Sequence, residues 1–384
     1  MKKSLLKLFG LTILTVSILT SCSNDDNETK PSSTFELVAD DLKGNINDGE
    51  VTLNASTVYK LTGALIVKDG AKLVIPAGTR IEGTVGTSYI GVAQGGQIFI
   101  NGTASNPVIL TSDKLVKAPG QWGGLVICGK APINKGASAS AEVSELTYGG
   151  SISNDNSGSI RYLRIEYSGF AYNSEKEFNG LSLFGVGSGT TIEYVQVHEG
   201  ADDGFEFFGG TVNTKYLVST SNEDDQFDWT EGWNGTNEFW FGKLGLGRGN
   251  RGIEADNNSN NHMATPISNP TISKLTLIGL GDQGTESQAL KLRVGTKGLF
   301  DNVVLSNFLI GFDIQHTEST GYVSAESLKA TSVRFIDVPT RTKGRDTAAG
   351  VVDVTAVYSE NVSATGAGNG TETPTWATGW TVGL

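Results

Sequence analysis

The sequence contains few of the residues that build disulfide frameworks or transition-metal sites. Only two cysteines and three histidines occur among its 384 residues. Cys22 belongs to a leader segment, so Cys128 stands alone and no structural disulfide is expected. Cys128 ends the apolar run Leu125–Cys128, which favours a buried hydrophobic role over a reactive thiol. His262 and His316 have no partners at metal-ligand spacing, which argues against zinc.

Helical periodicity is also missing. No stretch repeats Ala, Leu, Glu and Lys at the 3.6-residue period of a helix. Proline is scarce, with 9 residues, whereas glycine reaches 50 without a collagen period. Short alternating runs of Val, Ile, Thr, Phe and Tyr occur instead, separated by glycine-containing turns. This pattern predicts an all-β protein made of many short strands.

Basic residues are outnumbered by acidic residues. The chain has 29 Lys and Arg against 41 Asp and Glu, and its formal net charge is −12. An acidic protein repels phosphate backbones, so nucleic acid is not expected as a partner. Cations, and neutral or cationic ligands, fit this charge better, although the same charge also keeps a secreted protein soluble.

The N-terminus has the pattern of a bacterial lipoprotein leader. Basic residues at positions 2 and 3 precede an apolar stretch over residues 8–19, which is too short to span a bilayer permanently. The stretch ends in Leu19-Thr20-Ser21-Cys22, which resembles the lipobox in which the cysteine thiol receives diacylglycerol. We therefore predict a signal peptide over residues 1–21 and a lipid anchor on Cys22.

An acidic run follows the predicted lipidation site. It contains Asp25, Asp26 and Glu28, and it resembles an export signal that directs lipoproteins to the cell surface. A plain solvated tether is the alternative interpretation. We predict an acidic flexible tether over residues 22–34 and place the chain at the outer membrane, anchored by the lipid of Cys22 and exposed at the cell surface.

The body of the chain contains an internal repeat of about 22 residues. Residues 194–197 are echoed by residues 216–219, and residues 203–207 by residues 225–229. A unit this short cannot bury its apolar side alone, so successive units are expected to stack. The predicted fold is a single-stranded right-handed parallel β-helix, an all-β solenoid with short decorating loops, over residues 35–384.

Short motifs resemble those of an uncharacterised group of bacterial surface lipoproteins with a right-handed parallel β-helix. In chain order they are Leu61-Thr62-Gly63, Val74-Ile75-Pro76-Ala77-Gly78-Thr79, Asn101-Gly102-Thr103-Ala104-Ser105-Asn106-Pro107, Trp122-Gly123-Gly124-Leu125, Glu166-Tyr167-Ser168-Gly169 and Gly200-Ala201-Asp202-Asp203-Gly204-Phe205-Glu206. The resemblance covers most of the chain, up to about residue 229. The group has no established activity, so the resemblance implies a fold and a surface location and supplies no catalytic residues.

Acidic residues recur at equivalent positions of successive coils. They are Asp202, Asp203, Glu206, Asp224, Asp225, Asp228 and Glu254. If the register holds, carboxylates in adjacent coils are about 5 Å apart and repel by roughly 3–4 kcal/mol at an effective dielectric of about 20. Such a column would hold a cation, share a proton or be fully solvated. Calcium is the candidate ion, because carboxylates, amides and carbonyls supply the oxygen ligands that it takes.

Two further residues are candidates for ligand contact. Trp233 lies in a turn sequence, where an exposed ring would stack on a sugar, whereas core packing is the favoured interpretation for the aromatic group to which it belongs. Arg251 is expected to project near the acidic column. Two other tryptophans, Trp376 and Trp380, are expected to cover the open end of the solenoid, which otherwise exposes a sheet edge.

Three functions follow from these features, and the last of them is a purely structural component of the surface layer. The first is a surface-anchored, non-enzymatic module that binds a glycan or a partner outer-membrane protein with the help of calcium. The second is a polysaccharide-degrading enzyme with carboxylates on adjacent coils, because glycoside hydrolysis needs two carboxyl groups. A lyase would instead combine calcium ligands with a basic residue such as Arg251 or Lys291.

Overall fold

The computed structural model describes residues 33–384 apart from residues 174–175 and residue 285. The predicted signal peptide (residues 1–21) and the predicted lipidation site Cys22 lie outside the described residues, as does most of the predicted tether.

The last two residues of the predicted tether already contact the folded part. The backbone N–H of Thr34 donates a hydrogen bond to Oδ1 of Asp48 at 2.8 Å, and the hydroxyl of Ser33 donates to the same oxygen at 3.0 Å. Within the part of the chain that the structure describes, no helix is both long and apolar enough to cross a membrane.

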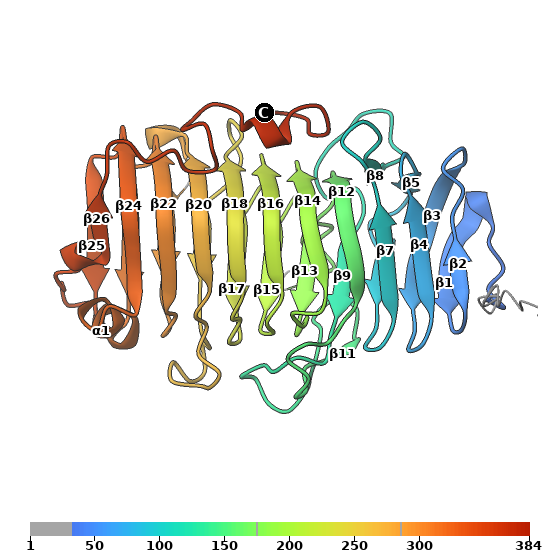
Figure 1. Cartoon of the computed structure of the whole chain (residues 1–384), viewed down its shortest axis with the longest axis horizontal. Helices are drawn as coiled ribbons and strands as arrows, with labels where there is room; N and C mark the ends of the chain where they lie inside the picture. Colours follow the sequence, from blue (N-terminus) through green and yellow to red (C-terminus); the bar gives the residue numbers. More distant parts are fainter. Residues whose placement is uncertain (1–32, 174–175, 285) are drawn as a thin grey trace, which may run out of the picture. The chain divides into compact units, whose positions relative to one another are not determined.

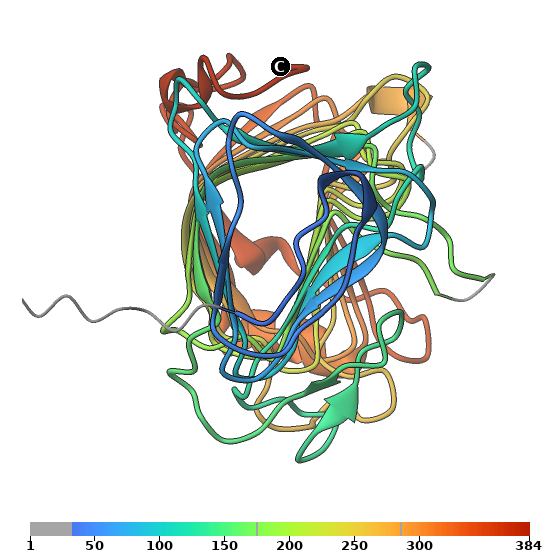
Figure 2. The ribbon, with the colours of Figure 1, turned by 90° about the vertical axis from the view of Figure 1, so that its right-hand side faces the viewer.

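The described chain forms a parallel β-helix whose coils have three faces (Figures 1 and 2). Face A contains β1 (Leu42–Ile46), the second half of β3 (Val58–Val67), β6 (Tyr89–Val92), β9 (Leu125–Cys128), β13 (Leu181–Phe184), β15 (Phe205–Phe208), β17 (Phe227–Thr230), β19 (Ile253–Ala255), β21 (Gln288–Leu292), β23 (Ile310–Gln315) and β25 (Thr340–Arg345). Every pairing within the 24-stranded sheet is parallel, so the predicted solenoid is confirmed.

Faces B and C are built by short strands near the N-terminus and by long strands after them. The short strands are β2 (Glu50–Thr52), β4 (Lys72–Pro76) and β7 (Gln97–Asn101) on face B, and the first half of β3, β5 (Arg80–Gly83) and β8 (Val108–Ser112) on face C. The long strands run over both faces: β12 (Gly158–Glu166), β14 (Thr191–His198), β16 (Asn213–Thr220), β18 (Thr236–Lys243), β20 (Thr271–Ile278), β22 (Gly298–Ser306) and β24 (Leu328–Ile336), followed by the short β26 (Tyr358–Glu360). One α-helix among the described residues, α1 (Thr317–Ser324), connects β23 to β24.

Each long strand bends between face B and face C at one left-handed residue. These residues are Tyr162, Tyr194, Tyr216, Phe239, Lys274, Asn302 and Ser332, with φ from 51° to 61°. The left-handed conformation costs about 1–2 kcal/mol for a residue that is not glycine. Stacked rings offset part of this cost, since the ring of Tyr194 lies 4.3 Å from that of Tyr162 and 4.3 Å from that of Tyr216. The bend was not predicted, because aromatic residues rarely adopt positive φ.

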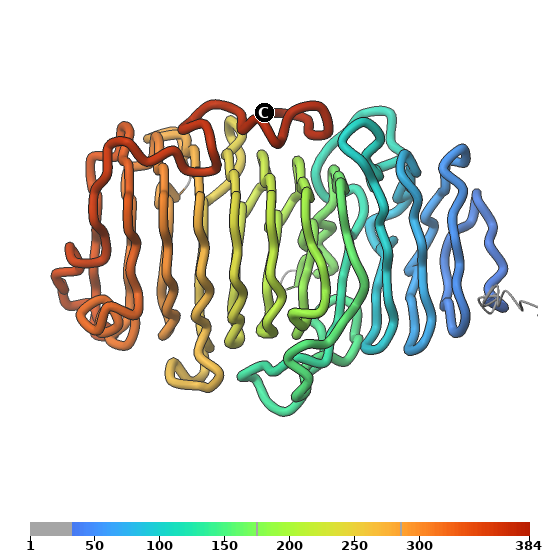
Figure 3. The backbone as a smooth tube through the Cα atoms, viewed as in Figure 1, coloured from blue at the N-terminus to red at the C-terminus, as the bar shows by residue number. Residues whose placement is uncertain are grey.

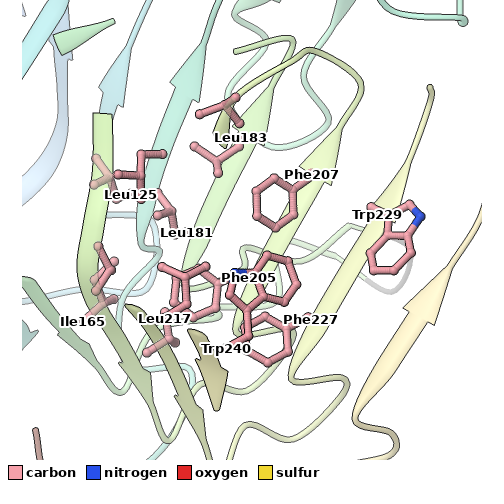
Figure 4. Packing of buried hydrophobic residues seen from close by; sticks show 14 of the residues in the cluster. Leu125, Ile165, Leu181, Leu183, Phe205, Phe207, Leu217, Phe227, Trp229 and Trp240 are labelled. Carbon is pink, nitrogen blue, oxygen red and sulfur yellow. The ribbon is translucent and has the colours of Figure 1, made fainter. Parts of the chain in front are cut away.

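The core is a stack of inward-pointing side chains (Figure 4). Phe205 pairs with Phe227 across adjacent coils, and their rings stack at 5.5 Å. Val195 pairs with Leu217, again 22 residues apart, so the predicted repeat is the real coil length here. Cys128 is fully buried, as predicted for a small hydrophobic residue.

We expected the C-terminal segment to cover an end of the β-helix, and this prediction is wrong. The segment runs back along the side of the coils (red in Figures 1 and 3). Trp380 is fully buried and packs edge-on against the bend residue Tyr162 at 5.8 Å. Gln196 exchanges two hydrogen bonds with the backbone of Val382, at 2.7 and 2.9 Å. The tryptophan covers aromatic rings that would otherwise form an exposed apolar patch.

Two insertions interrupt the coils at the corner that follows face A (lower part of Figure 2). Residues 129–157 contain the antiparallel hairpin of β10 (Ala139–Ser140) and β11 (Thr147–Tyr148), and residues 256–270 form the second insertion. The hairpin packs on the outside of face A, where the ring of Tyr148 lies 5.0 Å from that of Phe184. The second insertion lengthens the connection between β19 and β20.

Candidate functional site

The predicted acidic column exists on the outside of face A. Glu206 of β15 pairs with Asp228 of β17, and Asp228 pairs with Glu254 of β19. Lys291 of β21 follows in the same register. The connection between β17 and β19 is longer than one repeat, yet β19 keeps the register that places Glu254 beside Asp228. A shift of one residue would turn the apolar side chains of these strands outward.

The remaining predicted acidic residues lie in the turns that lead into β15 and β17. Asp202 and Asp203 precede β15, whereas Asp224 and Asp225 precede β17. The two turns are joined by a hydrogen bond that the backbone N–H of Asp225 donates to Oδ1 of Asp203 at 2.9 Å. All seven predicted metal-ligand residues, Asp202, Asp203, Glu206, Asp224, Asp225, Asp228 and Glu254, therefore lie together, and we call them the acidic centre.

Ligand atoms of the acidic centre come within 4.8 Å of one another in three overlapping groups. They are Asp202–Asp203–Asp224, Asp203–Glu206–Asp228 and Asp225–Asp228–Glu254. The third group differs from the other two because lysine and arginine side chains balance its negative charge.

Arg251 neutralises the third group from within. Its Nη1 lies 3.1 Å from Oδ2 of Asp225 and 2.6 Å from Oε2 of Glu254, and its Nη2 donates to Glu286. Arg251 is 5% exposed. Its carboxylate partners raise the pKa of the guanidinium, which burial alone would lower. Arg251 therefore occupies the place of a cation, and Lys291 adds a second positive charge 3.6 Å from Glu254.

The middle group has no such partner. Among the described residues, Asp203, Glu206 and Asp228 form no ion pair with any lysine or arginine. We call these three residues the central triad. The amide Nδ2 of Asn179 donates a hydrogen bond to Oε2 of Glu206 at 2.6 Å, while the buried Oδ1 of Asn179 finds no partner within the described chain. A carbonyl oxygen beside three carboxylates is the donor set that calcium prefers.

Burial raises the pKa of all three carboxyls of the central triad well above their ordinary values, and neighbouring charges add to the effect. For Asp203 the main neighbours are Asp202 and Asp228, and for Asp228 they are Glu206 and Glu254. For Glu206 the nearest contributor is Asp203. Without a cation, these carboxyls keep their protons to a higher pH than exposed carboxyls do. A divalent cation would displace the protons.

A comparison with known protein families fits this geometry. A family model described as a pectate-lyase like beta helix domain matches residues 44–381. The chain belongs to this family. No curated protein and no solved structure gives a significant match.

Membership of the pectate-lyase-like β-helix family confirms the fold that the surface-lipoprotein resemblance implied. It also supports a polysaccharide-related role, and it does not distinguish a binding module from an enzyme. The lipoprotein character of the chain stays a prediction.

Two further carboxylates of this pectate-lyase-like β-helix face the acidic centre and were not predicted. Glu142 comes from the hairpin insertion and Glu177 from the loop before β13. The charges of both raise the pKa of Asp202, after burial and Asp224. Neither residue belongs to the 22-residue repeat, and the same holds for Asn179. The repeat was the only signal that located the site, so these three residues gave no sequence signal.

The predicted ligand contact of Trp233 is wrong. The ring is 0% exposed, stacks on Phe207 at 3.9 Å and donates its Nε1–H to the carbonyl of Val212 at 3.2 Å. Two successive left-handed residues, Glu231 with φ 57° and Gly232 with φ 87°, turn the chain just before the tryptophan. This turn directs the ring into the core, so Trp233 offers no surface to a sugar ring.

The raised pKa values of this pectate-lyase-like β-helix predict how stability depends on pH. A carboxyl whose folded pKa exceeds its unfolded value of about 4 binds more protons when folded, so stability falls as pH rises above that value. In chelator, we expect the melting temperature to decrease from pH 5 to pH 8. Saturating calcium should flatten this slope, because the bound ion replaces the protons. Thermal melts at pH 5 and pH 8, with chelator and with calcium, measure this dependence. If the Asp228→Asn variant showed the same dependence of melting temperature on pH, the triad would not be its cause.

Proposed function

We propose that this chain is a lipid-anchored cell-surface protein that binds polysaccharide without cleaving it, and that calcium in the acidic centre takes part in binding. The proposal combines the family's polysaccharide-related role with the lipobox at Cys22 and the chemistry of the central triad. A partner outer-membrane protein is the other class of ligand for the same surface.

The observation that carries the proposal is the unbalanced charge of the central triad. Asp203, Glu206 and Asp228 place ligand oxygens within 4.8 Å of one another, no described basic side chain pairs with them, and Asn179 brings an unpartnered carbonyl oxygen. Calcium takes about six to eight oxygens, more than these side chains fill with one oxygen each. Hydroxyl or carboxylate oxygens of a glycan would complete the coordination.

Arg251 is poorly suited to serve as the base of an elimination reaction. A lyase needs a base that loses its proton readily, but the partners of Arg251 hold its proton more firmly than usual. The guanidinium is also buried among carboxylates that it neutralises. Arg251 therefore acts as a fixed positive charge that shapes the centre.

Calcium binding is the first test of the proposal. Titration calorimetry should detect calcium binding, and calcium at about 100 times its Kd should stabilise the fold by about 2.7 kcal/mol. Asp203→Asn and Asp228→Asn should abolish the heat of binding and the thermal shift. Glu193→Gln should leave both unchanged, because Glu193 of β14 pairs with Arg161 of β12 and lies outside the acidic centre. A melting temperature that neither calcium nor chelator moves would remove calcium from the proposal.

A polysaccharide-degrading enzyme is the second candidate. Glu206 has a raised pKa and lies next to Asp228, and a carboxyl that stays protonated beside a second carboxyl can serve as a general acid. Incubation with a panel of acidic and neutral glycans separates the two functions. Glycan retention without new reducing ends or unsaturated products supports binding. Product release that Glu206→Gln abolishes would establish hydrolysis instead.

A further inference from the structure

A cavity of about 460 Å³ lies at the opposite ends of the strands that carry the acidic centre. Asp203 and Asp225 precede β15 and β17, whereas Gly210 and Gly232, which line the cavity, follow these strands. Each strand has four residues and is therefore about 13 Å long. No residue of the acidic centre lines the cavity, so the two sites are separate.

The two insertions form the walls of this cavity and are fixed to each other. Ser153 comes from the first insertion and Pro266 from the second. The amide Nδ2 of Asn134 lies 2.8 Å from Oδ1 of Asn257 and 3.0 Å from the carbonyl of Pro266, which links the insertions. The cavity is therefore preformed, and its volume falls within the range of about 300–1,000 Å³ that is usual for small-molecule sites.

The residues that line the cavity include one lysine and two polar residues whose side chains form no hydrogen bond within the described chain. Lys297 lines the cavity, and within the described chain no carboxylate forms an ion pair with it. Its Nζ lies 4.6 Å from the centre of the Tyr322 ring, which holds the ammonium group in place. Thr265 and Asn269 also line the cavity, and their side chains make no hydrogen bond with other described residues. An unpaired lysine in a chain with net charge −12 marks a place for an anionic group.

We propose that this cavity binds a sugar unit that carries a carboxylate or sulfate group. The anionic oxygens pair with Lys297, and the sugar hydroxyls bond to Thr265 and Asn269. A carboxylate and a sulfate present the same charged oxygens, so either group fits the lysine. Binding does not need calcium, because the acidic centre takes no part in it.

Titration in the presence of chelator tests this site apart from the acidic centre. The probes are glucuronic acid, glucose 6-sulfate and glucose. At least one anionic sugar is expected to bind, and glucose should bind about tenfold more weakly because it lacks the charge-assisted hydrogen bond to Lys297. Whichever anion binds more tightly identifies the group that the cavity takes. Equal binding of glucose, or no binding of either anion, would overturn the proposal.

Two variants and one control make the test specific. Lys297→Met should weaken binding of the anionic sugar about tenfold, and Ser153→Trp, at an exposed position, should block it by filling the cavity. Lys215→Met is the control, because Lys215 lines a smaller cavity of about 210 Å³ and pairs with Glu238 at 2.8 Å. Melting temperatures verify folding. Unchanged binding of the anionic sugar in both Lys297→Met and Ser153→Trp would refute the site. The calcium titration tests the acidic centre independently, so this result would not affect the proposed calcium site.

Discussion

Replacing Arg251 with methionine is expected to destabilise the protein by about 3–5 kcal/mol at neutral pH. The guanidinium is 5% exposed and contacts Asp225, Glu254 and Glu286. Methionine preserves much of the side-chain volume but leaves the buried carboxylate of Asp225 without a counter-charge, whereas Glu254 keeps its ion pairs with Lys291 and Arg293. Removing one partner of a buried ion pair is strongly destabilising. The midpoint of urea unfolding measures the loss.

The pH dependence of this variant separates lost charge from lost packing. Without Arg251 the carboxyls take up protons as pH falls, which removes the repulsion. The destabilisation should therefore be smaller at pH 5 than at pH 8. Arg248→Met is the matched control, because Arg248 is partly exposed and pairs with Glu199 at 3.3 Å. Its loss should cost less than about 1 kcal/mol. Equal losses in both variants at both pH values would show that Arg251 does not balance the centre.

The sequence predicted the fold and the acidic column for one physical reason. In a parallel β-helix, residues one coil apart lie side by side, so a repeat of 22 residues converts sequence spacing directly into contact. The sequence alone therefore pairs Glu206 with Asp228, and the alternation in Phe205-Glu206-Phe207 is consistent with Glu206 pointing outward.

The parts of the site that were not predicted come from segments without a repeat. Asn179 and Glu142 reach the acidic centre from a loop and from an insertion, whose paths depend on packing that no spacing encodes. The role of Arg251 was missed in part, since its direction depends on the turn before β19. The C-terminal segment was misplaced for the same reason, because its hydrogen bonds to Gln196 join residues 186 positions apart.

Trp233 is where the sequence interpretation and the structure make opposite experimental predictions. The structure predicts that Trp233→Ala lowers stability by about 3–5 kcal/mol, because the substitution leaves a large cavity beside Phe207 and removes the hydrogen bond to Val212. Urea unfolding should show this loss, and the folded fraction should bind glycan with unchanged affinity. Trp376→Ala is the control, since that ring is only partly buried and packs on the outside of the coils, so its loss should be smaller. A Trp233→Ala protein with a normal unfolding midpoint and lost glycan binding would restore Trp233 as a surface ligand contact, because a core residue cannot be removed without a stability cost.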